Sequence, residues 1–153
     1  MIVAEREDEL ALRAAKSAAL KAWAAIQPYY GGTFEIHATD DGPSTTADRL
    51  ADQILCRELQ AIFPPSEYGY LTEETKDDFQ RLERERVWII DPIDGTNDFI
   101  EKTGMFCIQI GLVRRTDDGY QIVAALLYDP PNGRFFTALA GRGAFLESDS
   151  GEV

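Results

Sequence analysis

One stretch, residues 87–96, constrains the fold of this chain more than any other, and its sequence is VWIIDPIDGT. Its first four residues are apolar and rich in β-branched side chains, which predicts a buried strand. Two aspartates, Asp91 and Asp94, follow this strand directly, with a proline between them and a glycine after them. Proline fixes φ, and glycine lets the backbone turn sharply and come close to a ligand. We therefore expect the strand to deliver both carboxylates to one rim of a sheet.

The residues after this turn, 97–102, predict a short helix that ends at Thr103-Gly104. The free N–H groups at the start of this helix would face the same rim as the two aspartates. Carboxylates bind cations and N–H groups bind anions, so the pair suits a metal-assisted phosphate site. The alternative is an ordinary turn, because Asp and Gly both favour turns for local reasons. Other segments of the chain decide between these two interpretations.

The length and charge of the chain limit its partners. Its 153 residues fit one domain with a core of ordinary size. Its 27 acidic residues outnumber its 15 basic ones, for a net charge of −12. This balance argues against a nucleic acid polymer or an anionic membrane surface as the main partner. A small phosphorylated molecule remains compatible if a divalent cation offsets the charge repulsion at the site.

The two cysteines indicate a reducing compartment. Cys56 and Cys107 lie far apart and lack metal-ligand spacing, so we expect two reduced, buried thiols. The N-terminus contains no apolar run of signal-peptide length, and no stretch of the chain reaches transmembrane length. The sequence therefore predicts a cytoplasmic protein.

The N-terminal half predicts two helices. Residues 8–26 lack Gly and Pro and place alanines at helical spacing, which gives a small-residue face for close packing. The second helix follows Thr45, shows an amphipathic pattern and ends at Pro64-Pro65. Thr45 and Asp48 have capping-box spacing, so a helix cap is the simplest role for Asp48.

A pair of acids, Glu73 and Glu74, follows a probable strand and precedes the charged run 76–86. The residues alone leave two interpretations open, because such acids are either metal ligands or ordinary solvated side chains. Beyond residue 105 the pattern changes to a two-residue period over four short segments separated by turns. Strands this close together must be antiparallel neighbours. The sequence thus predicts an α+β fold, two helices packed on an antiparallel sheet, with the Glu73 loop and the Asp91 turn at a common edge.

Three segments taken together resemble a known family. They are DGPSTTAD at 41–48, LTEET at 71–75 and WIIDPIDGTNDFI at 88–100, and in this order they resemble the inositol monophosphatase superfamily. The resemblance implies the N-terminal half of a layered αβαβα sugar-phosphatase fold. Asp98 stands where inositol monophosphatases usually have Asn. An acid at this position is more similar to the 3′(2′),5′-bisphosphate nucleotidase (CysQ-like) branch.

This resemblance implies a Mg²⁺-dependent phosphomonoesterase that converts adenosine 3′,5′-bisphosphate to AMP and phosphate. The alternatives are an inositol-1-phosphate phosphatase and, from another class, a non-catalytic metal-binding or interaction module. The resemblance also implies that Glu73, Asp91, Asp94 and the main-chain carbonyl of Ile93 bind Mg²⁺. Hard cations do prefer carboxylate and carbonyl oxygens.

The resemblance also implies roles in catalysis. Thr96, oriented by Asp48, is expected to help Glu73 deprotonate a water that the metal holds, and this water attacks phosphorus in line. Asp94, Gly95 and Thr96 are expected to lie against the substrate phosphate, the last two through their N–H groups.

The sequence departs from the family at its end. Family members continue into a second α/β domain with a Trp-Asp-x-Ala-type motif, which supplies another metal ligand and much of the substrate pocket. This chain stops at Val153. We therefore expect residues 1–153 to be an N-terminal metal-binding domain that, without the C-terminal domain, binds Mg²⁺ weakly and turns over poorly. An uncovered sheet edge or face also predicts self-association, as a homodimer or as aggregates.

Overall fold

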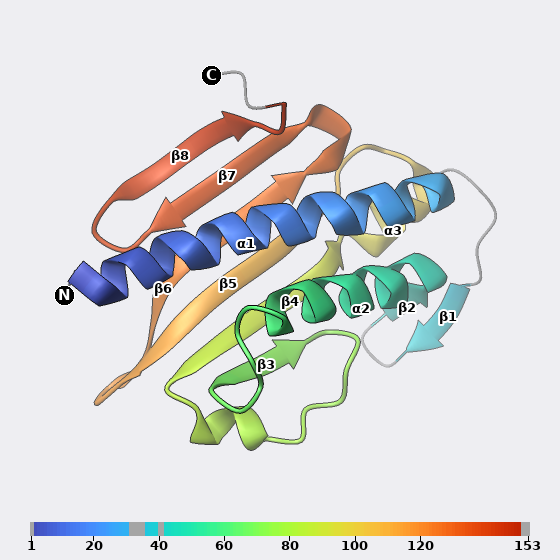
Figure 1. Cartoon of the computed structure of the whole chain (residues 1–153). Coiled ribbons are helices and arrows are strands. Elements are labelled where there is room, and N and C mark those ends of the chain that lie inside the picture. Colours follow the sequence, from blue (N-terminus) through green and yellow to red (C-terminus); the bar gives the residue numbers. More distant parts are fainter. Residues whose placement is uncertain (1, 31–35, 40–41, 151–153) are drawn as a thin grey trace.

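The computed structural model describes residues 2–30, 36–39 and 42–150 and has two layers. Helices α1 (Ile2–Ile26) and α2 (Thr46–Gln60) pack against each other and cover one face of a six-stranded sheet, as Figure 1 shows. Helix α1 lies over β6 (Gly119–Asp129), and α2 lies over β4 (Arg86–Asp94). The expected α+β fold, with the two N-terminal helices packed on a sheet, is confirmed.

The sheet has the strand order β3-β4-β5-β6-β7-β8. Its other strands are β3 (Tyr68–Thr72), β5 (Cys107–Thr116), β7 (Arg134–Leu139) and β8 (Gly143–Ser148). From β4 to β8, each strand runs antiparallel to the next one in the order. The short turns between β5, β6, β7 and β8 predict this arrangement. A separate hairpin of β1 (Ile36–Thr39) and β2 (Gly42–Thr45) precedes α2. Residues 40–43 have the sequence DDGP, which favours a turn. This segment lies partly outside the described residues, and its Gly42 and Pro43 belong to β2.

Strand β3 corrects the expectation of a purely antiparallel sheet. It runs parallel to β4, with Tyr68 opposite Arg86 and Thr72 opposite Ile90. A parallel pair needs a long connection, and residues 73–85, which include the short helix η2 (Gln80–Glu83), provide one. Because both strands run the same way, the residues that follow them leave the sheet at the same end. The parallel pairing therefore brings Glu73 to the side of Asp91.

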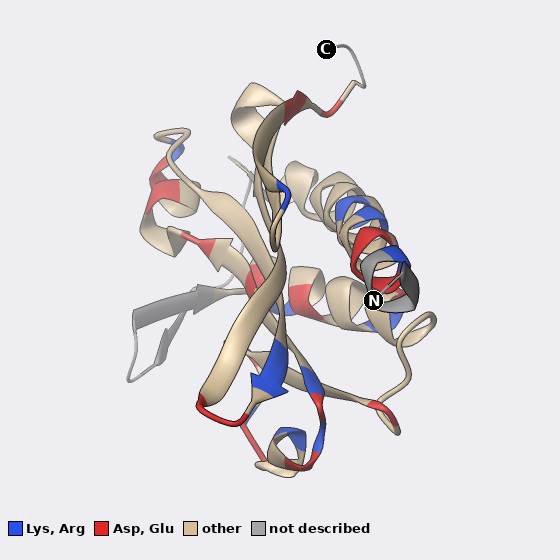
Figure 2. Ribbon diagram, turned by 90° about the vertical axis from the view of Figure 1, so that its left-hand side faces the viewer, with Lys and Arg blue, Asp and Glu red and all other residues tan. Residues whose placement is uncertain are grey.

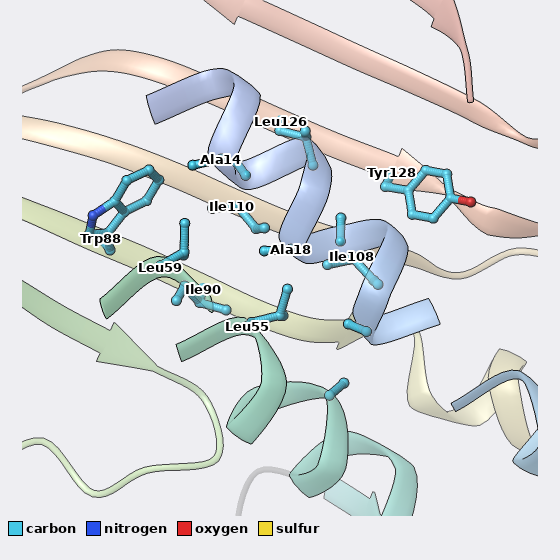
Figure 3. Packing of buried hydrophobic residues seen from close by; sticks show 14 of the residues in the cluster. Ala14, Ala18, Leu55, Leu59, Trp88, Ile90, Ile108, Ile110, Leu126 and Tyr128 are labelled. Carbon is cyan, nitrogen blue, oxygen red and sulfur yellow. The ribbon is translucent and has the colours of Figure 1, made fainter. Parts of the chain in front are cut away.

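The two helices follow the sequence patterns closely. Helix α1 begins at Ile2, earlier than the predicted Asp8, and its alanine face is buried against α2 and the sheet. Figure 3 shows Ala14 and Ala18 of α1 facing apolar side chains of the sheet, with Leu55 and Leu59 of α2 beside them. Small alanines let the helix approach the sheet closely. Among the described helices, none is long and apolar enough to cross a membrane.

An aromatic cluster fixes the short helix α3 (Thr96–Glu101). Phe99 of α3 is fully buried, and its ring centroid lies 5.4 Å from that of Tyr30 and 5.1 Å from that of Phe106. Trp23 of α1 joins the cluster at 5.9 Å from Phe106. Buried aromatic pairs of this kind stabilise a core beyond their area burial. The cluster thus anchors the segment that follows the Asp91 turn.

The sheet face opposite the helices is apolar and exposed. A shallow hollow of about 620 Å³ on this face is lined in part by Ile89, Ile122, Phe136 and Phe145. These four side chains are between 42% and 63% exposed. Large exposed apolar surfaces commonly take part in protein association.

We expect this face to drive self-association of the described chain. Sedimentation velocity over a range of protein concentrations should show that the wild-type chain associates. The double substitution Ile122→Lys and Phe145→Lys should remove this association, because contact between two chains through this face would bury two charges. Ile62, 48% exposed but outside the hollow, provides the matched control Ile62→Lys. A wild-type chain that stays monomeric at all concentrations would contradict the prediction.

Candidate active site

The N-terminus of α2 places Asp48 and Thr45 together. The N-cap hydroxyl of Thr45 accepts hydrogen bonds from the backbone N–H groups of Ala47 (3.1 Å) and Asp48 (3.4 Å). Oδ2 of Asp48 accepts in return from Thr45 N at 2.7 Å, which completes the predicted capping box. Asp48 is only 1% exposed, so its carboxylate is held rigidly. The cap uses Oδ2, and Oδ1 remains for a second contact.

That second contact is with Thr96, at the start of α3. The Thr96 hydroxyl lies 3.0 Å from Oδ1 of Asp48 and 3.2 Å from the carbonyl oxygen of Ile93. A hydroxyl has one proton to donate. When that proton faces Asp48, the carbonyl of Ile93 keeps both lone pairs for another partner. The structure therefore brings together three residues that the sequence singled out, although their catalytic roles stay predictions.

The turn between Asp94 and Thr96 requires glycine. Gly95 has φ of +98°, and a Cβ atom there would lie 3.0 Å from the carbonyl oxygen of Met105 and 3.3 Å from Cα of Phe106. Residues other than glycine rarely adopt a positive φ. The chain therefore passes directly against the segment before β5, which sets the position of Asp94 and Thr96.

Asp91 and Glu73 meet at the ends of the two parallel strands. The backbone N–H of Glu73 donates to the carbonyl of Ile90 at 3.3 Å, and Oδ1 of Asp91 accepts from the N–H of Ile93 at 3.1 Å. Burial, then a hydrogen bond with Glu73 and its charge, then the charge of Asp94 raise the pKa of Asp91 to about 7. Three carboxylates are therefore near enough to influence one another. Figure 2 shows acidic segments at the end of β4 and along α3.

Glu74 takes a different position from Glu73. Oε2 of Glu74 lies 4.0 Å from Nε of Arg49, on helix α2. The structure thus distinguishes the two acids, which the residues alone could not. Glu73 faces the Asp91 turn, whereas Glu74 faces a cation on the neighbouring helix.

Asp94 is directed toward strand β5. Its Oδ2 accepts a hydrogen bond from Nε2 of Gln109 and lies 3.8 Å from Sγ of Cys107. Both residues were missed as site residues, although their alternation in the strand places them on one face. In the described part of the chain, no three His, Cys, Asp or Glu side chains already form a compact metal-binding group.

The residues present nevertheless fit a hard divalent cation. Glu73, Asp91 and Asp94 supply carboxylate oxygens, and Ile93 supplies a carbonyl oxygen, which are the ligands that Mg²⁺ prefers. The raised pKa of Asp91 reflects burial beside the negative charge of Glu73 and Asp94, and among the described residues no basic side chain offsets it. A cation among these oxygens would offset that charge.

The chain is similar to known proteins of one family. The profile of the inositol monophosphatase family matches residues 7–153. The inositol-1-monophosphatase of Mesorhizobium japonicum is 33% identical over 132 residues, which are 84% of this chain and 47% of that protein. The 3′(2′),5′-bisphosphate nucleotidase CysQ of Aggregatibacter actinomycetemcomitans is 34% identical over 113 residues, which are 72% of this chain and 39% of that protein.

Solved structures share the fold. The extragenic suppressor protein SuhB from Bartonella henselae superposes with a TM-score of 0.79 at 29% identity, over 90% of this chain and 52% of that one. A structure described as an IMPase/NADP phosphatase complexed with Mg²⁺ and phosphate has a TM-score of 0.70 at 25% identity, over 83% of this chain and 47% of that one. The chain spans about half the length of these relatives. The family profile, the relatives and the fold agree, and the chain belongs to the inositol monophosphatase family.

Proposed function

We propose that this chain is the N-terminal, metal-binding half of a Mg²⁺-dependent phosphomonoesterase. The observation that carries the proposal is the meeting of Glu73 and Asp91 at the ends of two parallel strands, with Asp94 beside them. Relatives named as an inositol-1-monophosphatase and as a 3′(2′),5′-bisphosphate nucleotidase support phosphate ester hydrolysis. The solved relative with Mg²⁺ and phosphate supports the choice of cation.

In this proposal, four residues hold the cation: Glu73, Asp91 and Asp94 through carboxylates, and Ile93 through its carbonyl. Bound Mg²⁺ would supply a positive charge that makes a water more acidic and offsets charge on the leaving oxygen. Thr96 keeps its proton toward Asp48, so the Ile93 carbonyl stays available as a ligand.

The chain's own residues then carry out the proton transfer. Glu73, with help from the Thr96 hydroxyl that Asp48 orients, accepts a proton from the attacking water. A new bond forms between the water oxygen and phosphorus, the P–O ester bond breaks, and the leaving oxygen takes up a proton. Asp94 and the N–H groups of Gly95 and Thr96 position the phosphate for in-line attack by the water.

The favoured substrate is adenosine 3′,5′-bisphosphate, which would give AMP and phosphate. The motif that favours it includes Asp98, and in the structure Oδ1 of Asp98 accepts a hydrogen bond from the Thr103 hydroxyl at 2.5 Å. This contact joins Asp98 of α3 to the segment that follows the helix. Inositol 1-phosphate is the second candidate, because relatives with that activity in their names match at similar identity.

Phosphate release tests the proposal. The complete protein that contains this chain should release phosphate from adenosine 3′,5′-bisphosphate with Mg²⁺, and should do so faster than from inositol 1-phosphate under the same conditions. The opposite preference would select the second substrate. Hydrolysis at full rate in a chelator would rule out the metal-dependent mechanism.

A non-catalytic module is the candidate from another class, because the chain spans about half of its relatives. Calorimetry with the 153-residue chain distinguishes it from a catalytic half. If the chain is a catalytic half, we expect it to bind Mg²⁺ weakly and to hydrolyse little substrate. Tight association with a protein partner, together with no hydrolysis by the complete protein, would favour the module.

We also propose that the reaction takes place in the cytoplasm. Cys56 and Cys107 are free thiols that are half-buried in the structure. Free thiols are maintained in reducing compartments. Fractionation of the source cells would test this location.

The affinity for Mg²⁺ should depend on pH. The pKa of Asp91 is about 7 in the metal-free protein, so below pH 7 a cation must displace a proton from this carboxyl. We expect the apparent affinity to fall by up to about tenfold per pH unit below pH 7 and to level off above it. Calorimetry in buffers of different ionisation enthalpy measures the released proton. An affinity that is equal at pH 6 and pH 8 would contradict this coupling.

A further inference from the structure

Helix α2 carries a second buried carboxylate, Asp52, one turn after Asp48. Asp52 is only 5% exposed, and its partners are uncharged. Oδ2 accepts from the Thr75 hydroxyl at 3.2 Å, Oδ1 lies 3.9 Å from Sγ of Cys56, and the Thr72 side chain also hydrogen-bonds the carboxylate.

A carboxylate in this position is costly to the fold. Its burial raises the pKa of Asp52, because the charged form loses hydration. Hydrogen bonds from uncharged donors offset only part of such a loss. The helix cap does not explain Asp52, since Asp48 already completes it. The role of Asp52 therefore lies in the segment that its carboxylate holds in place.

Asp52 binds both ends of the turn that carries Glu73. Within the turn, Oγ1 of Thr72 accepts from the N–H of Thr75 at 3.1 Å. Two residues of this turn, Thr72 before Glu73 and Thr75 after it, hydrogen-bond Asp52. On the other side, the N–H of Glu73 donates to Ile90 of β4. The turn is thus fixed to α2 by side chains and to β4 by its backbone.

The opposite side of this turn is open. Asp52, Thr72 and Thr75 border a hollow of about 810 Å³ along the outer edge of β3. Core side chains do not fill this volume, so polar bonds rather than packing restrain the turn from that side.

We propose that Asp52 is a positioning residue that fixes the 72–75 turn and thereby directs the Glu73 carboxylate toward Asp91. Two buried aspartates on one face of α2 then hold the two sides of the site, Asp48 through Thr96 and Asp52 through the Glu73 turn. The structural part of this inference stands by itself, and the role of Glu73 in binding Mg²⁺ rests on the proposed function.

Amide hydrogen exchange, followed by NMR in the metal-free chain, tests the structural part. In Asp52→Ala the amides of Glu73 and Thr75 should exchange about tenfold faster, which is the effect of losing one or two hydrogen bonds. Asp52→Asn should give a smaller increase, because its amide oxygen still accepts one bond. Thr75→Val, which removes one donor and leaves Asp52 in place, serves as the second variant if Asp52→Ala fails to fold.

Asp77→Asn is the matched control. Asp77 borders the same hollow, but its carboxylate accepts hydrogen bonds from Arg81, at 2.7 Å, and from the N–H of Phe79 rather than from the Glu73 turn. Exchange at Glu73 and Thr75 should stay at the wild-type rate in this variant. Wild-type exchange in a folded Asp52→Ala, or equal acceleration in Asp77→Asn, would overturn the proposal.

Calorimetric titration with Mg²⁺ tests the consequence for the site. Asp52→Ala and Thr75→Val should each weaken Mg²⁺ binding by about tenfold, the lower range seen when an outer-shell partner of a ligand is lost. In the complete enzyme kcat should fall while KM changes little. Faster exchange with unchanged Mg²⁺ affinity would overturn the role of Asp52 at Glu73. If the wild-type chain binds no Mg²⁺, the proposed function fails, and the exchange result still decides whether Asp52 holds the turn.

Discussion

Asp91→Asn should abolish metal-dependent hydrolysis and at the same time stabilise the metal-free protein. The substitution removes one carboxylate ligand, and the cation contributes several kcal/mol of transition-state stabilisation, so we expect a loss of more than about 100-fold in phosphate release. It also removes a half-buried acid that lies beside Glu73 and Asp94. Less repulsion near neutral pH should raise the melting temperature by about 2–4 °C for each kcal/mol of stability gained.

The stability gain has a definite pH dependence. The pKa of Asp91 is raised from 3.8 to about 7 in the folded protein, so this group makes folding less favourable as pH rises between these values. The variant lacks this ionisation. The difference in melting temperature should therefore be small at pH 4, grow toward pH 7 and stay constant above it.

Asp77→Asn serves as the control for charge alone. Its carboxylate pairs with Arg81, whose guanidinium lowers the pKa of Asp77, so removal of this acid should not raise the melting temperature. Thermal unfolding in chelator at several pH values measures both variants. A lower melting temperature for Asp91→Asn above pH 7 would show that the three acids do not repel one another.

The second large effect is expected from Gly95→Ala. A β-carbon at this position meets the main chain of Met105 and Phe106, neither of which can move without displacing β5. The positive φ adds about 1–2 kcal/mol of strain for alanine. We expect the turn to shift and to carry Asp94 and Thr96 with it. A displacement near 1 Å costs on the order of 100-fold in rate.

Gly111→Ala is the matched control, because a Cβ atom there meets nothing within 4 Å. The control should keep wild-type phosphate release and stability, since alanine also reduces the entropy of the unfolded chain. Steady-state kinetics and thermal unfolding of both variants make the comparison. Equal activity for Gly95→Ala and wild type would mean that the turn does not set the site.

Local patterns predicted much of the fold. The capping box formed by Thr45 and Asp48, the buried strand before Asp91 and the hairpins after residue 105 depend on neighbours in sequence, and the structure confirms them. The family was also predictable, because three short motifs in a fixed order carry it.

The remaining features depend on contacts between distant segments. The sequences of β3 and β4 do not indicate that the two strands pair in parallel, because a short apolar run is compatible with either a parallel or an antiparallel neighbour. Asp52 sits in an amphipathic helix, where an acid is normally solvated, and only its approach to Thr75 makes it different. Gln109 lies in a strand whose side chains point alternately to the two faces of the sheet. Only its hydrogen bond to Asp94 shows that it belongs to the candidate site.

The long connection after Glu73 has a consequence for engineering. Lys76 is exposed, and the chain from there to β4 runs outside the sheet, so extra residues between Lys76 and Asp77 would leave both strand ends where they are. Each doubling of such a loop adds only about 0.6 kcal/mol of closure entropy. A fluorescent reporter domain inserted at this point would lie a few residues from Glu73 without separating it from Asp91. The loop is therefore a suitable place to build a sensor of occupancy of the proposed metal site.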